Sequence, residues 1–488
     1  MKYYIGIDIG TSSVKLTCID ENAKVAGESS REYKIEEPKS GWKEIDPEKW
    51  IKGMEEAFAE LFETIDSKKV EAIGVTGQMH TVIFVDREGK SIRPALMWND
   101  TRTANLIPKL REKIQMINEV SYISNIISTG SPAANLFWLS QYEEENFAKI
   151  HKFLIGPDYI AYRLTGKIQT DYCEASTSSL CDLKTGTWSE EIRRLFEFPR
   201  DIYPEIKGTC EVCGTVTKQW QEKFHFKQDV KVLTGTGDNP AAAIATGCFA
   251  KGYPVLSLGT SGVLMYPKKK INFEVKGKNI LFSMDGKDVL ILVQGVVQST
   301  GSSLAWWVKN TLQADDFMEE TTGVDLKHLG ENELMFYPHL VGDQDPELRG
   351  SFVGIGTDTT RKEMTIAVME GIAFAVKQLV SVMGVPKEEL SRLKVTGGGS
   401  KNEVWMQILA DVLNTKVEQL ESGAGAGYGI ALCAAAAGDE DLSMNDLIEQ
   451  TVSIKNTFIP RQYNRELYEQ KYQKYLRVYD ALKHIYQE

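Results

Sequence analysis

One aspartate stands among glycines and other small residues in the stretch LTGTGDNPAAAIATG, residues 233–247. Asp238 follows an apolar run that predicts a strand, and the alanines after it predict a helix. A carboxylate at such a turn can take a proton from a substrate, and its small neighbours leave room for that substrate. Asp238 could instead cap the helix, where Pro240 suits the first turn. Both roles suit one side chain, because a helix N-terminus favours the charged carboxylate.

A second set of polar groups lies in two Gly-Thr-Ser turns with similar surroundings. One turn is in IGIDIGTSSVKL, residues 5–16, and the other is in VLSLGTSGVLMY, residues 255–266. Each follows an apolar strand and leads into more strand-like sequence, which predicts a hairpin. The backbone N–H groups and hydroxyls of such turns can bind phosphate oxygens. The two turns therefore predict a duplicated domain and a nucleotide held between the two copies.

Three consecutive glycines lie in VTGGGSKNEVWMQILADVL, residues 395–413, between a predicted strand and a predicted helix. A flat ligand such as adenine could lie against this bare backbone, whereas an ordinary tight turn would need fewer glycines. Other nucleotide motifs are absent, since Phe84 replaces the first glycine of the P-loop that Gly89-Lys90-Ser91 would end. The glycines in SGAGAGYG, from Ser422, do not form a dinucleotide fingerprint and predict close helix packing instead.

Composition limits the classes of function. A chain of 488 residues with 42% hydrophobic and 25% charged residues predicts two large globular domains. A net charge of -12 argues against a nucleic-acid partner, which needs clustered Lys and Arg. We see no secretory signal and no stretch that approaches the roughly 20 apolar residues of a membrane span, so we expect no membrane partner and a cytoplasmic location. Seven scattered cysteines predict reduced thiols, with Cys210 and Cys213 in a surface loop rather than a zinc site.

Apolar strands alternate with helical segments along the chain, which is typical of an α/β fold. Asp46 and Pro47 predict the start of a helix over residues 46–65. We place the domain boundary at residue 250, giving domains over 1–250 and 251–488 with a cleft between them. Five predicted strands each end on glycine, over residues 3–10, 70–77, 230–237, 253–259 and 393–399.

The ordered motifs DIGTSSVK, GWKEIDPEKW, GQMH, WNDTRT, DYIAYRLTG, GTGDNPAAAIATG, LGTSG and GGGSKN resemble the FGGY family of carbohydrate kinases over nearly the whole chain. The resemblance implies two actin-like domains of the ribonuclease H type, with an interdomain cleft. It implies that the first domain binds the sugar and the second binds most of ATP, with Mg²⁺ as cofactor. GQMH and GDN are most similar to the D-xylulose kinases of the family, which implies that D-xylulose is the sugar.

The resemblance also implies roles for individual residues. Asp238 matches the general base, and Asp8 matches the acid that holds Mg²⁺ through water, although Asp8 could simply bond its own hairpin turn. Lys15 could reach the phosphates or be an exposed strand lysine. The remaining nucleotide positions are phosphate contacts at Thr11, Ser12, Thr260 and Gly301, and adenosine contacts at Gly398, Gly399 and Asn402.

The implied sugar contacts are Met79, His80, Trp98 and Asn239, together with Asp238. A polyol needs several fixed hydrogen bonds, which His80 and Asn239 can supply. Trp98 matches a tryptophan that packs on the substrate, although a core position is an equal interpretation.

Thr81 departs from the pattern of the D-xylulose kinases, which usually have Gly after the histidine. It would narrow the pocket or add a contact, so other ketoses, alditols and aldonates such as gluconate stay open as substrates. A catalytically silent actin-like regulator that binds nucleotide or sugar is the alternative of a different class. Retention of Asp8 and Asp238 argues against it. The family is often dimeric, but no coiled coil or exposed apolar stripe indicates a homodimer.

Overall fold

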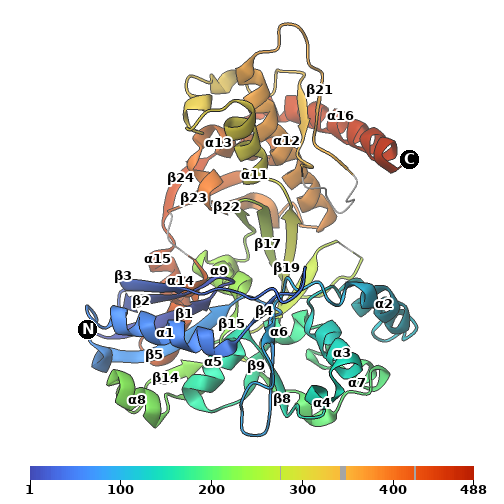
Figure 1. Ribbon diagram of the computed structural model, residues 1–488. Helices are drawn as coiled ribbons and strands as arrows, with labels where there is room; N and C mark the ends of the chain where they lie inside the picture. Colours follow the sequence, from blue (N-terminus) through green and yellow to red (C-terminus); the bar gives the residue numbers. More distant parts are fainter. Residues whose placement is uncertain (275, 341–347, 422–424, 488) are drawn as a thin grey trace.

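The computed structural model describes residues 1–274, 276–340, 348–421 and 425–487. The chain forms two lobes, each built around a seven-stranded sheet, and the two termini lie in different lobes (Figure 1). We call the part around the N-terminal sheet the first lobe and the part around the other sheet the second lobe. The two-domain α/β fold expected from the sequence is confirmed.

The first sheet combines antiparallel and parallel strands. Its antiparallel part joins β3 to β2 and β2 to β1, while β1, β5 and β14 run parallel and β13 closes the edge antiparallel to β14. The strands are β1 (Tyr3–Ile9), β2 (Ser13–Asp20), β3 (Val25–Glu32), β5 (Val70–Gly77), β13 (Val212–Thr215) and β14 (Lys231–Leu233), with β15 (Thr236–Gly237) also paired to β5.

The second sheet repeats this order. β19, β17 and β16 are antiparallel, β16, β22 and β23 are parallel, and β24 closes the edge antiparallel to β23. Both Gly-Thr-Ser turns therefore join the first hairpin of a sheet, as the predicted duplication requires. The strands are β16 (Val255–Leu258), β17 (Gly262–Lys268), β19 (Leu290–Val297), β22 (Arg392–Thr396), β23 (Lys416–Leu420) and β24 (Ile454–Phe458), with β18 (Lys278–Phe282) added beside β19.

Smaller elements extend the first lobe. A four-stranded sheet is formed by β4 (Glu44–Ile45), β7 (Ala95–Leu96), β6 (Val82–Val85) and β8 (Lys152–Ile155). The short strands are β9 (Gln169–Asp171), β10 (Cys181–Asp182), β11 (Thr187–Trp188) and β12 (Glu205–Lys207). The helices are α2 (Ile107–Gln115), α3 (Pro132–Tyr142), α4 (Glu144–Phe147), α5 (Gly156–Thr165), α6 (Tyr172–Thr177), α7 (Glu190–Leu195) and α8 (Lys218–Phe224).

Helix α1 (Pro47–Leu61) begins as the sequence predicts. The Asp46 side chain accepts the Glu48 N–H at 3.0 Å, and Pro47 is the first helical residue. The helix ends at Leu61, four residues before the end of the predicted segment, because the chain turns back on itself through Phe62–Ile65. Its buried face, which includes Trp50 and Phe58, packs on β2 and β3.

Helices cover the second sheet in the second lobe. They include α11 (Gly301–Ala305), α12 (Arg361–Val382), α13 (Glu403–Leu413) and α16 (Gln462–Gln487), with the short hairpin β20 (Met335–Tyr337) and β21 (Ser351–Val353) (Figure 1). Among the described helices, α12 is long and apolar enough to cross a membrane, which corrects the expectation that no such stretch exists. However, 72% of its apolar window is buried, as in the core helix of a globular domain.

Helix α14 (Ala426–Gly438) packs on the first sheet, although in the chain it lies between β23 and β24 of the second sheet. A Cβ on Gly6 would lie 1.9 Å from the Gly427 carbonyl oxygen, and a Cβ on Gly429 equally close to the carbonyl oxygen of Ala241 in α9 (Asp238–Ala245). These contacts confirm close helix packing for the glycine-rich segment, of which residues 422–424 lie outside the described chain.

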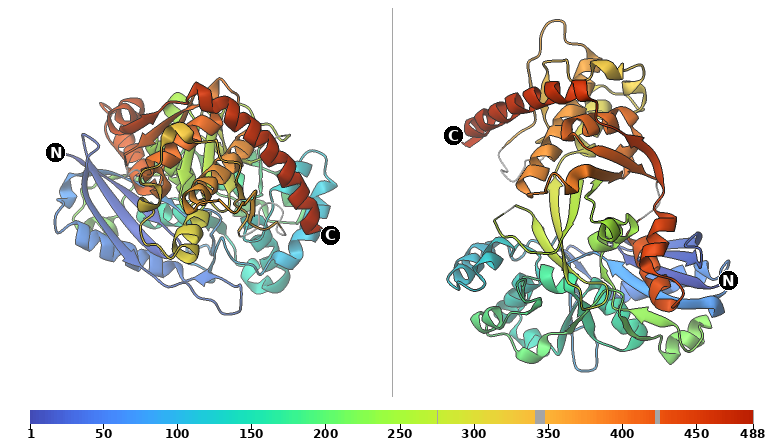
Figure 2. Two further views of the ribbon diagram at one scale, coloured as in Figure 1. Left: turned by 90° about the horizontal axis from the view of Figure 1, so that it is seen from above. Right: turned by 180° about the vertical axis from the view of Figure 1, so that it is seen from behind.

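A single boundary at residue 250 does not place every later helix in the second lobe. Helices α14 and α15 (Met444–Thr451) lie in the first lobe beside α9 (Figures 1 and 2). The short helix α10 (Cys248–Lys251) spans the proposed boundary. The division into 1–250 and 251–488 thus stays a prediction, from which α14 and α15 depart.

All seven cysteines are free thiols. The Cys213 thiol lies on β13, 3.6 Å from the Thr165 hydroxyl, whereas Cys210 packs against the apolar cluster that contains Cys433 of α14. The two members of the CxxC pair thus have different neighbours. Within the ranges that the structure describes, no group of three His, Cys, Asp or Glu side chains is arranged to hold a metal ion.

Candidate active site

Asp238 is the first residue of α9, directly after β15 ends at Gly237. Its side chain is not an N-cap, because the cap residue is Gly237, and its Oδ1 accepts the neighbouring Asn239 N–H at 2.8 Å. The interpretation of the Asp238 side chain as the N-cap of α9 is therefore wrong. A Cβ on Gly237 would lie 2.5 Å from Met79 Cγ, so only glycine lets the chain pass Met79 at this point.

Asp8 lies on β1 and interacts electrostatically with Asp238. Burial raises the pKa of Asp8 to about 6, against a smaller lowering by Lys15. Burial also raises the pKa of Asp238 to about 6, and the negative charge of Asp8 adds to that increase. The sequence suggested that the helix N-terminus would favour ionisation of Asp238, but loss of solvation outweighs it. The result is a carboxyl group whose pKa suits a general base near neutral pH.

Met79 and His80 follow β5 at the edge of the site. His80 has a positive φ of 69°, a backbone conformation that is uncommon for residues other than glycine. Its Nε2 lies 2.6 Å from the Nζ of Lys278, and because an ammonium group only donates, Nε2 accepts. Burial and the positive charge of Lys278 hold the pKa of His80 well below its usual range. His80 is therefore neutral at physiological pH and carries its proton on Nδ1.

Thr81 and Trp98 form a connected pair. The Thr81 side chain is fully buried, and its Oγ1 accepts the backbone N–H of Trp98 at 3.1 Å. The Trp98 ring is 46% exposed, which excludes a core role, and its Nε1–H donates to the Thr11 Oγ1 at 3.1 Å. The hydroxyl of Thr81 thus holds the backbone of Trp98. Thr81 stands where the D-xylulose kinases usually have Gly. Through this hydrogen bond it affects Trp98, a proposed sugar contact, rather than the sugar directly.

Three residues of the site carry no sequence motif. Gln294 of β19 accepts a hydrogen bond from Asn239 Nδ2 at 3.5 Å, and Lys278 of β18 contacts His80. Glu174 of α6 is fully buried, and its Oε1 would lie 3.1 Å from a Cβ on Gly237. Burial raises the pKa of Glu174 well above its usual value, and the nearby acidic groups of β9, α5 and α9 add to the increase. Its protonated form is therefore favoured.

The first Gly-Thr-Ser turn, which joins β1 to β2, is open to solvent. Ser12 is exposed at its tip, and Gly10 N–H donates to the Ser13 carbonyl at 2.9 Å to close the turn. Lys15 is 50% exposed and pairs with Glu28 at 2.8 Å. This geometry favours the exposed strand lysine over a phosphate contact for Lys15.

The second Gly-Thr-Ser turn joins β16 to β17 and contacts helix α11. Thr260 is exposed, and its carbonyl accepts the Ser302 N–H at 3.0 Å. A Cβ on Gly301, the first residue of α11, would lie 2.3 Å from the Gly259 carbonyl oxygen. Glycine at 301 is thus required by the contact between the turn and the helix, which leaves the Thr260 side chain free of crowding.

The three glycines after β22 differ in their surroundings. No heavy atom lies within 4 Å of a Cβ placed on Gly398, whereas a Cβ on Gly399 would lie 2.7 Å from Trp405 Cζ3. Asn402 is buried, and its Oδ1 accepts the Trp405 N–H at 3.0 Å as the cap of α13. Its Nδ2 donates to the Thr321 hydroxyl at 3.0 Å. Gly398 is therefore open to a ligand, while the amide of Asn402 is occupied within the fold.

The predicted site residues thus fall into two groups. One group contains Asp8, Asp238, Asn239, Met79 and His80, which are linked directly or through Lys278 and Gly237. It also includes the hydrogen-bonded pair of Trp98 and Thr11, since Thr81, next to His80 in the chain, accepts the Trp98 N–H. The other group, Thr260, Gly301, Gly398 and Gly399, gathers where β16 and β22 end, since a Cβ on Gly399 would touch Leu258. Within the described chain, no hydrogen bond or ion pair joins the two groups.

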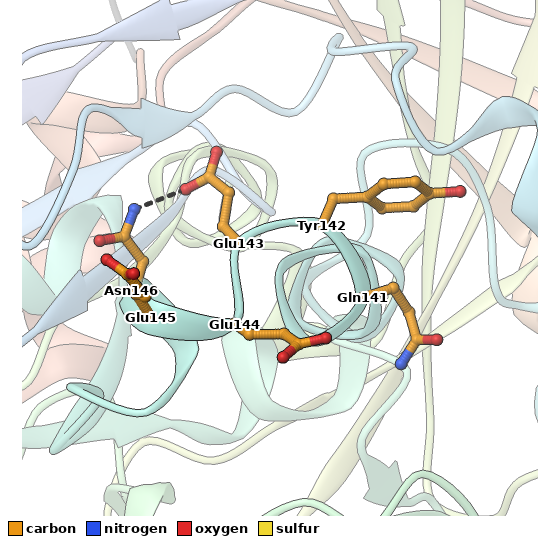
Figure 3. Close-up of a pocket in the computed structure, with 6 residues that line it drawn as sticks. All are labelled: Gln141, Tyr142, Glu143, Glu144, Glu145 and Asn146. Atoms are coloured by element: carbon orange, nitrogen blue, oxygen red, sulfur yellow. Dashed lines mark hydrogen bonds between the residues drawn. The ribbon is translucent and has the colours of Figure 1, made fainter.

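A hollow elsewhere on the first lobe has no part in this site. It lies where α3 meets α4 and is lined by Gln141–Asn146 (Figure 3). The side chains around it point in different directions, and Asn146 Nδ2 donates to Glu143 Oε2 at 2.7 Å. None of the predicted site residues lines this hollow.

Comparisons with known proteins cover both lobes. Residues 3–245 match the N-terminal domain of the FGGY family of carbohydrate kinases, and residues 255–438 match its C-terminal domain. A xylulose kinase from Bacillus subtilis is 32% identical, over 100% of this chain and 97% of its own length. The crystal structure of a xylulose kinase from Rhodospirillum rubrum superposes with a TM-score of 0.89 at 26% identity, over 100% of both chains. A glycerol kinase from Plasmodium falciparum, solved with ADP, shares the fold with a TM-score of 0.84 at 24% identity over 98% of both chains.

Proposed function

The chain belongs to the FGGY family of carbohydrate kinases, and we propose that it phosphorylates D-xylulose with ATP to give D-xylulose 5-phosphate and ADP. The observation that carries this proposal is the position of Asp238. It is a carboxyl group at a helix start, with Met79 and Asn239 beside it and Asp8 close enough to raise its pKa. Full-length relatives of several bacteria are xylulose kinases, which supports the choice of sugar.

Asp238 would act as the general base. In its ionised form it accepts the hydrogen bond of the terminal sugar hydroxyl and so directs the oxygen at the γ-phosphorus. As the new O–P bond forms, the P–O bond to ADP breaks and the hydroxyl proton passes to Asp238. Phosphoryl transfer depends chiefly on positioning and charge stabilisation, so one oriented carboxylate is a sufficient base.

Kinases of this family use ATP, and the described turns suit it. Gly398 offers an open backbone face for the adenosine, and the hydroxyls of the exposed Ser12 and Thr260 and of the partly buried Thr11 can donate to phosphate oxygens. Asp8 is a hard oxygen ligand in a site with an excess of acidic groups, which fits Mg²⁺ held through water. When bound, the ion would neutralise charge on the phosphates.

For the sugar, His80 and Asn239 supply polar contacts, and Met79 supplies an apolar one. His80 is neutral and donates through Nδ1, so it can bind a hydroxyl without carrying charge. Trp98 presents an exposed ring held at both its backbone and its indole nitrogen. A rigid aromatic face of this kind can pack on the carbon chain of a sugar.

A kinase for a different substrate, such as ribulose, gluconate or an alditol, is the second candidate, because Thr81 and its bond to Trp98 set the position of that ring. A silent regulator is disfavoured on physical grounds. Burying Asp8 and Asp238 together is costly, and a protein that only binds ligands has no need of such a pair.

The deciding experiment measures ADP release by the purified protein with MgATP and a panel of sugars. The panel is D-xylulose, L-xylulose, D-ribulose, L-ribulose, glycerol, xylitol, D-arabitol and gluconate, and Asp238→Ala is the control. We expect the highest kcat/KM with D-xylulose and no turnover by the variant. A preference for another sugar would change the substrate and keep the kinase, whereas no turnover with any sugar would favour the regulator.

A further inference from the structure

Two strands of the second lobe reach into the sugar end of the site. Lys278 of β18 and Gln294 of β19 are directly opposite each other in an antiparallel pair, so their side chains lie on the same face of the sheet. Both contact residues of the first lobe. Lys278 Nζ lies 2.6 Å from His80 Nε2, and Gln294 Oε1 accepts from Asn239 Nδ2 at 3.5 Å. The two lobes therefore meet at residues already proposed to bind the sugar.

The strands that carry this pair are anchored against the first lobe. The Leu281 N–H of β18 donates to Ser176 Oγ of α6 at 3.0 Å. Ile280 of β18 and Leu292 of β19 are buried in one apolar cluster with Met79 and Cys173 of the first lobe. Lys278 and Gln294 thus project from strands held in place by packing, rather than from an exposed loop.

Lys278 has hydrogen-bonding capacity that the protein does not use. An ammonium group has three donors, and in the described chain the only acceptor bonded to Nζ is His80 Nε2. The Lys278 side chain is partly buried, and the described residues provide no ion pair for it, although Asp238 and Glu174 lie close enough to raise its pKa against the larger lowering by burial. A buried charge without a close counter-ion is costly, which is more typical of a binding site than of a structural contact.

We propose that Lys278 binds the substrate, donating a hydrogen bond to an oxygen of the sugar, and that Gln294 is a positioning residue that holds the Asn239 amide. This inference rests on the proposed function. Because the ammonium group can only donate, it suits an acceptor-only carbonyl oxygen better than a hydroxyl. The substrate class that fits is therefore an open-chain ketose in preference to its alditol. The second lobe supplies part of the sugar site, so the site is complete only when both lobes are in contact.

The test uses Lys278→Met, which keeps the length and apolar stem of the side chain and removes its donors. Lys287→Met is the matched control, because Lys287 is an exposed lysine in the turn between β18 and β19. Initial rates are measured with D-xylulose varied at saturating ATP, with ATP varied at saturating sugar, and with xylitol in place of D-xylulose. Thermal unfolding of each variant reports on the fold.

We expect Lys278→Met to raise the KM for D-xylulose by about tenfold to a hundredfold, the usual effect of losing a hydrogen bond to a charged group. The KM for ATP should stay within about twofold, since the phosphate turns have no described contact with Lys278. The kcat/KM ratio of D-xylulose to xylitol should fall. The control should match the wild type in all three, and Gln294→Met should raise the KM for D-xylulose by about threefold to tenfold, as expected for a neutral hydrogen bond.

An unchanged KM for D-xylulose in Lys278→Met would overturn the assignment of Lys278. An unchanged ketose-to-alditol ratio would overturn the preference for a carbonyl oxygen. Should Lys278→Met not fold, Lys278→Gln replaces it and carries the same expectation with a smaller rise in KM. A wild type that phosphorylates no sugar would refute the proposed function itself, whereas an active wild type with an unaffected variant would refute only this inference.

Discussion

Asp238→Asn is expected to abolish turnover and at the same time to stabilise the fold. The amide has nearly the shape of the carboxylate, but it cannot accept the proton of the sugar hydroxyl and carries no charge. In the folded protein, burial and Asp8 raise the pKa of Asp238 from 3.8 to about 6. The folded protein thus binds this proton more tightly than the unfolded chain does. Stability therefore falls as the pH rises from about 4 to 6 and stays reduced above pH 6.

The size of the stability change follows from the difference between the pKa of Asp238 in the folded protein and in the unfolded chain. Ionising Asp238 costs the folded state about 3 kcal/mol at pH 7, at 1.36 kcal/mol for each pKa unit. The cost falls to about 1.5 kcal/mol at pH 5, because the folded protein is then largely protonated at this site. An Asn at position 238 removes the cost at every pH. If the unfolding unit is between one lobe and the whole chain in size, a stabilisation of about 3 kcal/mol raises Tm by about 3–6 °C.

The assay pairs ADP release with thermal unfolding of the wild type and Asp238→Asn at pH 7 and pH 5. Asp229→Asn serves as a surface control, since Asp229 is 78% exposed and removal of its charge should change stability by less than about 0.5 kcal/mol. A variant that is inactive and no more stable than the wild type at pH 7 would refute the electrostatic argument. A variant that retains turnover would refute the assignment of the base.

Three further predictions follow from the site. The kcat/KM for the sugar should fall about tenfold per pH unit below an apparent pKa near 6, because protonated Asp238 cannot act as a base. A pH profile in which kcat/KM begins to fall only near pH 4 would contradict this prediction. Thr81→Val leaves the partly buried Trp98 N–H without its side-chain acceptor, so it should cost about 0.5–1.5 kcal/mol of stability and raise the sugar KM several-fold. Thr81→Ser should keep both at wild-type values, and equal behaviour of the two variants would show that the hydroxyl is unimportant. Gly398→Ala should leave Tm unchanged and raise the KM for ATP about tenfold, because the new methyl group meets only the ligand. By contrast, Gly6→Ala should unfold the protein, because its methyl group would collide with Gly427. An unaffected KM for ATP in Gly398→Ala would place the adenosine elsewhere.

The fold could be predicted because its signals are local in the sequence. The Gly-Thr-Ser turns of the two lobes are each flanked by strands of matching pattern, and each pair forms a hairpin between neighbouring strands. Duplication followed from comparing two short segments, without knowledge of any long-range contact. The helix cap at Asp46 is equally local, since donor and acceptor are two residues apart. Local hydrogen bonding and strand patterning were sufficient for this level of structure.

The parts of the site that sequence could not predict depend on contacts between distant segments. Lys278 and Gln294 stand in an ordinary strand pattern, and only the packing of β18 and β19 against the first lobe brings them to His80 and Asn239. Asn402 shows the opposite case. The resemblance implied an adenosine contact for Asn402, whereas in the fold its side-chain oxygen caps α13.

Charge was the other property that local reasoning misjudged. A helix N-terminus favours an ionised Asp238, but that effect is small beside the loss of water around a buried carboxylate. The number of acidic groups that share the site depends on the tertiary fold, because Asp8 and Glu174 come from β1 and α6. The resemblance proposed Asp238 as the base, whereas its protonation behaviour followed only from its neighbours in the fold.

The balance of charge explains why the site depends on its ligands. Asp8, Asp238 and Glu174 are three acidic groups, and Lys278 is the described cation whose charge acts on both Asp238 and Glu174. Without its ligands, the protein holds the pKa of Asp8 and of Asp238 at about 6 and that of Glu174 well above its usual value. A fraction of the Asp238 side chains is therefore protonated as the pH falls toward 6, and that fraction cannot act as a base. A cation near Asp8 would remove the contribution of Asp8 to the raised pKa of Asp238 and so favour the ionised base. Full ionisation of the base would then depend on the cation that accompanies the nucleotide phosphates.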